Sequence, residues 1–269
     1  MNKKISIDIY RKSKNSILPN PLFHRPLDNL HSRCIEYPLV ASKIPAGKIK
    51  LLDVGTAKSD DSWILWLSGN RDIKVYAVDY DKPEITIPKN VSFLQSDVRN
   101  LPYSDCTFDV ITAVSVIEHI GLFKPQVNDP VLPLIDKNGD LDAFKEMLRV
   151  LKPGGKLIIT FPYGKEEKLI LNNEARCYNS KSLLRFGKIA KKVNSECYEY
   201  QFEDFAEYCS YPKPYTARVI DRIVGNLTSR QERFYTRGTS VTWRKINPTQ
   251  IKAENEWHVD GILCTVWEK

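Results

Sequence analysis

The chain lacks several sequence signals that would each point to a particular class of protein. No apolar run approaches the roughly 20 residues that a membrane-spanning helix needs, and the first ten residues lack the continuous apolar core of a signal peptide. The six cysteines contain no C-x-x-C pair and form no metal-ligand cluster with the four histidines. No internal repeat or low-complexity tract is visible. We therefore expect a cytoplasmic protein with no membrane span and no bound metal.

The net charge of +7 is concentrated at the two ends of the chain. Residues 1–50 hold 10 Lys or Arg against 3 acids, and residues 210–269 hold 10 against 6, whereas residues 51–209 hold 20 against 24. An enzyme that acts on nucleic acid needs a basic stripe beside its active site to pair with phosphates. Because the central part is not basic, such a stripe would have to come from the ends, and nucleic acid is the less favoured partner.

Two apolar runs that end at a carboxylate form the most informative pattern in the chain. Residues 51–57 read LLDVGTA, with Asp53 before the turn, and residues 75–79 read VYAVD, with Asp79 at the end. In a doubly wound α/β sheet, ligands bind at the carboxyl ends of the strands, and an acid after the second strand takes ribose hydroxyls. The pattern therefore predicts a nucleoside site.

The first turn has one glycine where a dinucleotide-binding fingerprint has three. Gly55 is followed by Ala57 and Ser59, whose Cβ atoms crowd the approach of a pyrophosphate, and Asp60 and Asp61 place negative charge there. A nucleoside without phosphate, which carries a cationic centre and an amino-acid tail, suits this turn better. S-adenosylmethionine is such a molecule.

Three further segments continue the series: residues 91–97 (VSFLQSD), 107–114 (TFDVITAV) and 151–160 (LKPGGKLIIT). With them, residues 49–162 closely resemble the class I S-adenosylmethionine-dependent methyltransferase family. The matching motifs are D-V-G at 53–55, D at 79, S-D at 96–97, F-D at 108–109, S-V-I-E-H at 115–119 and L-K-P-G-G at 151–155. The resemblance implies a fold and a cofactor, and says much less about the methyl acceptor.

For the cofactor, the resemblance implies a set of contacts along the carboxyl ends of the strands. The backbone around Gly55 would lie against the methionine part, Asp53 would face its amino group, and Asp79 would hold the ribose diol. Asp97 would accept from the adenine amino group while Val98 packs near the ring; the alternative for Asp97 is a loop acid that caps the next turn. The candidate cofactor residues are Asp53, Gly55, Thr56, Ala57, Asp79, Tyr80, Asp97, Val98, Ser115, Glu36 and Tyr37.

Two of these candidates precede the first strand, in a predicted short helix over residues 32–40. In similar methyltransferases this segment often covers the cofactor, which makes Glu36 and Tyr37 candidates for secondary cofactor contacts. The alternative is an amphipathic helix that simply packs on the sheet.

Catalysis is expected after the fourth strand, at Glu118 and His119. Methyl transfer needs a deprotonated or neutral nucleophile in line with the methyl group, and a hydroxyl acceptor also needs a base, for which a histidine has a suitable pKa. The alternative is a structural or cofactor-side role for this pair, since Glu118 at a helix start also complements the helix dipole. Tyr163, Arg176 and Tyr178 are the candidate acceptor-binding residues; for the latter two the alternative is a lead-in to a helix from residue 180.

The alternation of strands and helices predicts an α/β fold with a doubly wound, mostly parallel, seven-stranded Rossmann-like sheet and an antiparallel last strand. Within it we expect an N-terminal lead at residues 1–48, a cofactor-binding core at 49–202, an insertion and probable substrate cap at 203–260, and the last strand at 261–269. Alternate residues of that strand, from 262 to 267, should face opposite sides of the sheet.

Three further segments extend the resemblance: the E-Y-P lead at 36–38, the long loop after Glu118-His119, and the closing D-G-I-L-C-T-V-W-E-K at 260–269. With them, the whole chain also looks like a subset of these methyltransferases associated with surface polysaccharide and sugar modification. The first hypothesis is therefore an S-adenosylmethionine-dependent methyltransferase that acts on a sugar, a glycan or another small polar metabolite. One alternative is an RNA methyltransferase that uses the basic ends. Another is a methyltransferase-like binding subunit that has lost catalysis, against which the retained acids at 53, 79 and 97 argue.

Overall fold

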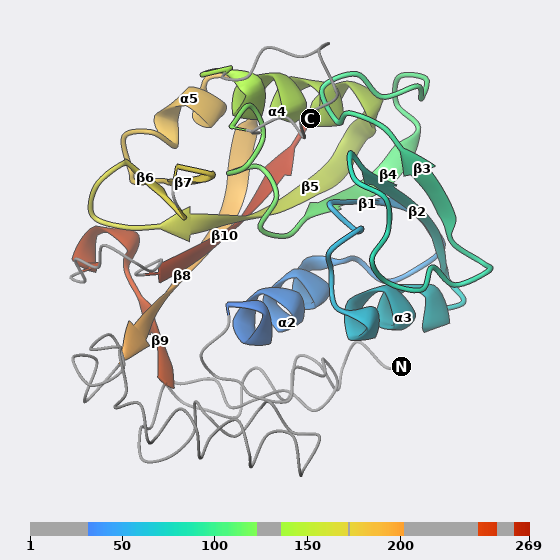
Figure 1. The fold of residues 1–269 in the computed structure, drawn as a ribbon, viewed down its shortest axis with the longest axis horizontal. Coiled ribbons are helices and arrows are strands. Elements are labelled where there is room, and N and C mark those ends of the chain that lie inside the picture. The colour runs from blue at the N-terminus through green and yellow to red at the C-terminus, as the bar shows by residue number, and fades with distance from the viewer. Residues whose placement is uncertain (1–31, 123–135, 172, 202–241, 252–260) are drawn as a thin grey trace, which may run out of the picture.

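A computed structural model describes residues 32–122, 136–171, 173–201, 242–251 and 261–269, and these form an eight-stranded sheet with helices on both faces (Figure 1). The strand order is β3-β2-β1-β4-β5-β10-β8-β9. The strands are β1 (Ile49–Val54), β2 (Ile73–Asp79), β3 (Ser92–Gln95), β4 (Phe108–Ala113), β5 (Leu151–Tyr163), β8 (Lys191–Gln201), β9 (Thr242–Ile246) and β10 (Gly261–Glu268).

Strands β3, β2, β1, β4 and β5 are parallel, and β10 runs antiparallel to both β5 and β8. The chain order reverses between β1 and β4, which lie side by side, so the switch point of the sheet is at their carboxyl ends. The predicted fold class is confirmed. The sheet also has one strand more than expected, because β9, from within the predicted insertion, pairs with β8 at the edge.

Alternate residues of each central strand feed two separate hydrophobic cores. On one side, Leu52, Ile111 and Ile159 pack with helix α4 (Gly139–Val150); on the other, Leu51 and Val110 pack with helices α2 (Arg33–Lys43) and α3 (Asp61–Gly69). Residues 262, 264 and 266 of β10 face the α2 side, and residues 263 and 267 face the α4 side, as expected. Burial on both faces explains why these strands read as continuous apolar runs.

The remaining elements lie beyond β5. A two-stranded hairpin of β6 (Lys168–Ile170) and β7 (Ala175–Cys177) is followed by α5 (Leu184–Gly187), on the same side of the sheet as α4 (Figure 1). The helix expected from residue 180 to about 190 is therefore only one turn long. A short 3-10 helix, η2 (Pro248–Gln250), follows β9. Among the described residues, no helix has the length and apolar character to cross a bilayer.

Candidate active site

The turn after β1 is held tightly against the segment that follows β4. Gly55 has φ +84°, and a Cβ atom built there would lie 2.0 Å from Cγ2 of Val116. This position needs glycine because it combines the left-handed backbone with a close approach of another segment. In the same turn, Thr56 is fully buried and its hydroxyl donates to the Asp53 carboxylate at 2.7 Å. The first turn therefore packs directly against the segment that contains Val116.

Asp79 ends β2 beside this turn, and its two carboxylate oxygens have separate backbone donors. The Ala57 amide donates to Oδ2 at 2.8 Å, and the Asp81 amide donates to Oδ1 at 2.9 Å. Because a carboxylate oxygen accepts more than one hydrogen bond, both oxygens retain capacity for a diol. Burial raises the pKa of Asp79, and the two amide donors act in the opposite direction. The neighbouring Tyr80 is half-buried, and its carbonyl accepts from Gln95.

The Asp53 carboxylate, by contrast, is buried, and its hydrogen bonds come from protein groups. Its carboxylate accepts hydrogen bonds from the hydroxyl groups of Thr56 and Thr112, both at 2.7 Å, and from the Trp63 indole at 3.0 Å. Burial raises the pKa of Asp53, which these three donors oppose. The geometry gives Asp53 a role in joining β1, β4 and α3, and the place opposite the cofactor's amino group, directly or through water, stays a prediction.

Asp97, after β3, is held by Arg99. The guanidinium donates to both carboxylate oxygens, with its shortest contact at 2.6 Å, and the Arg99 amide donates to Oδ1 at 2.8 Å. This last bond is the turn-capping alternative considered for Asp97. Val98 is buried in the α4-side core, at 8% exposure. An adenine contact for Asp97 and Val98 remains a prediction.

Helix α2 places two predicted cofactor residues in the interior, where they support the β4 and β5 ends. Glu36 is fully buried and accepts from the hydroxyls of Ser115 and Thr160, both at 2.6 Å, and from Arg33 at 2.8 Å. Burial acts to raise the pKa of Glu36, but Arg33 and the two hydroxyls outweigh it and hold this pKa below its ordinary value. Glu36 is therefore ionised, and it joins α2 to Ser115 and Thr160.

Tyr37 is also buried, and its ring stacks on Trp63 with the centroids 4.9 Å apart. Its hydroxyl accepts from the Asp60 amide at 3.0 Å, just before α3. Glu36 and Tyr37 therefore support the surrounding turns. This corresponds to the alternative of a helix that packs on the sheet, and not to the predicted cofactor contact. Ser115, which binds Glu36, has φ +47°, so the chain turns sharply there.

His119 is the candidate base, and the structure fixes its tautomer. Its Nδ1 lies 2.7 Å from the carbonyl oxygen of Glu174, which can only accept, so Nδ1 carries the proton. The side chain is 38% exposed, and its Nε2 is left as the acceptor of the neutral ring. Burial is the main cause that lowers the pKa of His119, and hydrogen bonding to Glu174 acts against it.

Glu118 lies beside His119 but is enclosed. Its side chain is 3% exposed, and its Oε1 is 4.0 Å from Nε2 of His119. Its Oε2 is buried and has no hydrogen-bond partner in the part of the chain that the structure describes. Burial, and then the charge of Glu36, raise the pKa of Glu118 to about 8.

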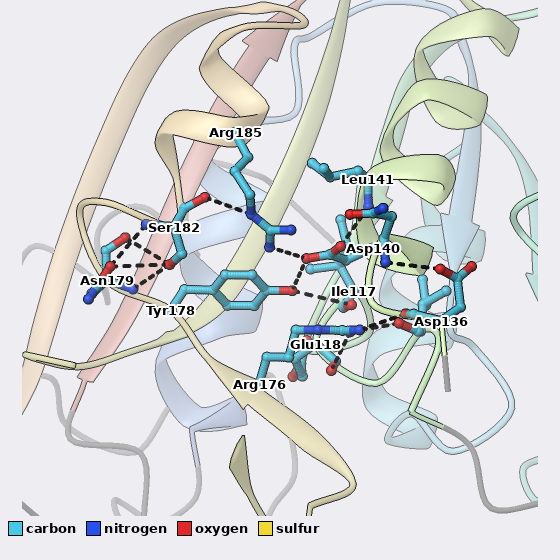
Figure 2. A network of polar contacts seen from close by, with 12 residues as sticks. Ile117, Glu118, Asp136, Asp140, Leu141, Arg176, Tyr178, Asn179, Ser182 and Arg185 are labelled. Atoms are coloured by element: carbon cyan, nitrogen blue, oxygen red, sulfur yellow. Dashed lines mark hydrogen bonds and ion pairs between the residues drawn. The ribbon is translucent and has the colours of Figure 1, made fainter. Parts of the chain in front are cut away.

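Two of the predicted acceptor-binding residues, Arg176 and Tyr178, belong to a buried network that includes Glu118, Asp136 and Asp140 (Figure 2). Arg176 donates from its guanidinium to the carbonyls of Ile120 at 2.6 Å and Asp136 at 3.1 Å, and from its amide to that of Glu118 at 3.1 Å. Tyr178 donates to the Asp140 carboxylate at 3.1 Å.

Arg176 is 6% exposed and Tyr178 is fully buried. Tyr163, at the end of β5, is 2% exposed, and burial raises its pKa to about 12. Contact of these three residues with the acceptor stays a prediction. In the structure Arg176 binds backbone carbonyls on both sides of His119, and Tyr178 binds Asp140 and the Ile117 carbonyl. Local sequence cannot reveal these roles because the bonded partners lie 38 to 61 residues away.

The polar groups left available at the switch point fit S-adenosylmethionine. Asp79 retains acceptor capacity for a ribose diol, Gly55 gives a turn without a side chain, and the orphan oxygen of Glu118 lies in the adjoining segment. The fold and this edge together define a nucleoside-binding α/β enzyme of the class I type.

Residues 46–207 match the methyltransferase domain family, and the chain belongs to that family. It is an S-adenosylmethionine-dependent methyltransferase, and the predicted cofactor is confirmed. The ubiquinone/menaquinone biosynthesis C-methyltransferases UbiE of Idiomarina loihiensis and Pseudomonas aeruginosa are both 32% identical to it over 114 residues. That alignment covers 42% of this chain and only 38% and 37% of those relatives.

Similar solved structures are more distant. The YcgJ protein of Bacillus subtilis is 16% identical, with a TM-score of 0.48 over 86% of this chain and 96% of its own. The phosphoethanolamine N-methyltransferase 2 of Haemonchus contortus, in complex with S-adenosyl-L-methionine, is 13% identical, with a TM-score of 0.46 over 84% of this chain and 50% of its own.

Proposed function

We propose that this methyltransferase transfers the methyl group to a hydroxyl of a sugar, a glycan or another small polar metabolite, with His119 as the base that takes the hydroxyl proton. The observation that carries the proposal is the hydrogen bond from His119 Nδ1 to the Glu174 carbonyl. It fixes the proton on Nδ1 and leaves Nε2, on a partly exposed side chain, to accept another.

In this mechanism the protein's contribution is positioning and proton removal. When bound, S-adenosylmethionine supplies a methyl group on a sulfonium centre that is neutralised by the transfer. Asp79 would hold the ribose diol and the backbone at Gly55 the methionine part. Arg176 fixes the backbone on both sides of His119 through the Glu118 and Ile120 carbonyls, so the imidazole is held in one place before an acceptor arrives.

The charge distribution supports a small polar acceptor over RNA. Residues 51–209, which contain the candidate active site, hold 24 acids against 20 Lys or Arg, and such a composition disfavours a polyanion. The basic N-terminal residues that an RNA acceptor would need lie outside the described residues. The short alignment with UbiE does not carry the acceptor of those enzymes over to this chain.

The experiment is a transfer assay with methyl-labelled S-adenosylmethionine and a panel of sugars, nucleotide sugars, oligosaccharides and small hydroxylated metabolites, with RNA and a quinone as competing classes. Label should appear on a hydroxyl of one of the polar compounds. With that acceptor, His119→Gln should lower kcat by about 100-fold to 10,000-fold, because the proton acceptor is lost, and should leave the affinity for S-adenosylhomocysteine unchanged.

The pH dependence provides a second criterion. Because the pKa of His119 is lowered from its ordinary value of 6.5, kcat should fall on acidification with its midpoint below pH 6.5, as the imidazole becomes protonated. Transfer of label to RNA or to a ring carbon would replace the proposed acceptor class. A normal kcat in His119→Gln would reject the base.

A further inference from the structure

The carboxyl group of Glu118 is the one buried acid of the site that has an oxygen without a donor, among the residues that the structure describes. Asp53 and Glu36, by contrast, each accept three hydrogen bonds. A buried polar atom without a hydrogen-bond partner is unfavourable, so such an atom in a native site calls for a missing partner. The unpartnered oxygen of Glu118 therefore indicates a polar ligand group that binds to it.

The charges around Glu118 determine its state before a ligand binds. Glu36 and Arg33 face it from α2, Tyr178 lies on the β7 side, and His119 is its neighbour in sequence. Burial and the negative Glu36 outweigh the positive Arg33 and the hydrogen bonding from the Glu118 amide and the Ser115 hydroxyl, and the resulting pKa of about 8 means that Glu118 carries a proton at neutral pH. A cation brought next to its free oxygen would stabilise the carboxylate and displace that proton.

The position of Glu118 indicates which cation this is. Val116, two residues earlier, packs directly against Gly55, so Glu118 belongs to the segment that lies on the first turn. That turn is where the methionine part of the cofactor is expected. Asp53, the acid expected to serve the amino group there, is buried and already accepts hydrogen bonds from Thr56, Thr112 and Trp63.

We infer that Glu118 binds the ammonium group of the amino-acid part of the cofactor through Oε2, and that it gives up its proton to solvent when the cofactor binds. This inference rests on the proposed function, because it assigns a partner to the bound S-adenosylmethionine. It gives the Glu-His pair a divided role, in which Glu118 holds the cofactor and His119 faces the acceptor. The proton balance is simple: one carboxylic acid becomes a carboxylate, and one proton enters the buffer.

The test is calorimetric titration of the full chain with S-adenosylhomocysteine, which carries the ammonium group but cannot react. Measurements at pH 7.0 in phosphate and in Tris, whose ionisation enthalpies differ, give the number of protons released, and we expect a value approaching one. The affinity should rise nearly tenfold from pH 6.0 to 7.0, because ligand binding then competes with a proton. Glu118→Gln should release no proton, show no such pH dependence, and bind about tenfold more weakly at pH 7.0 because a charge-assisted hydrogen bond is lost.

Two controls isolate the contact. Methylthioadenosine, which has the nucleoside but no amino-acid part, should bind the wild-type chain and Glu118→Gln equally and release no proton from either. His119→Gln should still release the proton with S-adenosylhomocysteine, which excludes the imidazole as its source. Tight binding of S-adenosylhomocysteine without proton release, or undiminished binding by Glu118→Gln, would overturn the inference and leave the proposed function standing. Absence of any binding to the wild-type chain would overturn both.

Discussion

Replacement of Gly55 by alanine should destabilise the protein through two separate effects, and the chain contains a glycine that isolates one of them. The added Cβ would lie 2.0 Å from Cγ2 of Val116, whereas carbon atoms in favourable contact are about 3.5 to 4.0 Å apart. The φ of +84° adds about 1 to 2 kcal/mol for a residue with a side chain. Overpacking of this kind adds about 1 to 3 kcal/mol.

Gly154 is the matched control, because its φ is +73° and nothing lies within 4 Å of a Cβ built there. Gly154→Ala should therefore lose only the backbone contribution of about 1 to 2 kcal/mol, and Gly55→Ala should lose about 2 to 5 kcal/mol. The assay is urea unfolding, in which both variants should shift the midpoint while the slope m is unchanged.

A second substitution tests the clash itself. Val116→Ala removes the two Cγ atoms, so in the double variant with Gly55→Ala it should recover stability, with a coupling of about 1 to 3 kcal/mol. Equal losses for Gly55→Ala and Gly154→Ala, or additive losses in the double variant, would refute the steric argument.

Two further predictions concern the acids of the site. Asp79→Asn should weaken S-adenosylhomocysteine binding by about tenfold or more in calorimetric titration, because one charge-assisted bond to the ribose is lost. The control is Asp109→Asn, which breaks an ion pair with Lys152 at the opposite end of β4 and should leave the affinity unchanged. Unchanged affinity in folded Asp79→Asn would remove the ribose assignment. Glu118→Gln should become more stable relative to wild type as the pH rises from 4.5 to 8. The reason is that folding raises the pKa of Glu118, so the wild-type protein loses stability over that interval. At about 1.4 kcal/mol per pH unit, the largest expected difference in the free energy of unfolding is about 5 kcal/mol. Thermal unfolding across that range measures it, and parallel curves would contradict the buried, protonated state of Glu118.

The strands of the parallel core could be predicted because their signals are local. Apolar runs that stop at Asp53 or Asp79, and the L-K-P-G-G segment that begins β5, are visible within a few residues, and these strands lie in the segments expected. The strand β9 was missed because its five residues carry no strong alternation, and pairing with β8 defines it.

The roles of individual polar side chains depended on contacts that local sequence does not contain. Arg176 and Tyr178 have the chemistry of ligand-binding residues, but carbonyls 40 to 58 residues away use the guanidinium, and Asp140 takes the tyrosine hydroxyl. Glu36 is similar, since its partners Ser115 and Thr160 lie 79 and 124 residues away. Residue type indicates what a side chain can bind, whereas the long-range packing determines what it does bind.

The pairing of β8 with β9 has a consequence for how this enzyme can be altered. Gln201 and Thr242 are register partners, so β8 and β9 pair at these two residues although forty residues lie between them in the sequence. A tight hairpin turn spans such a gap in two residues. We therefore expect that a variant in which a short turn joins Gln201 to Thr242 keeps the pairing of β8 with β9.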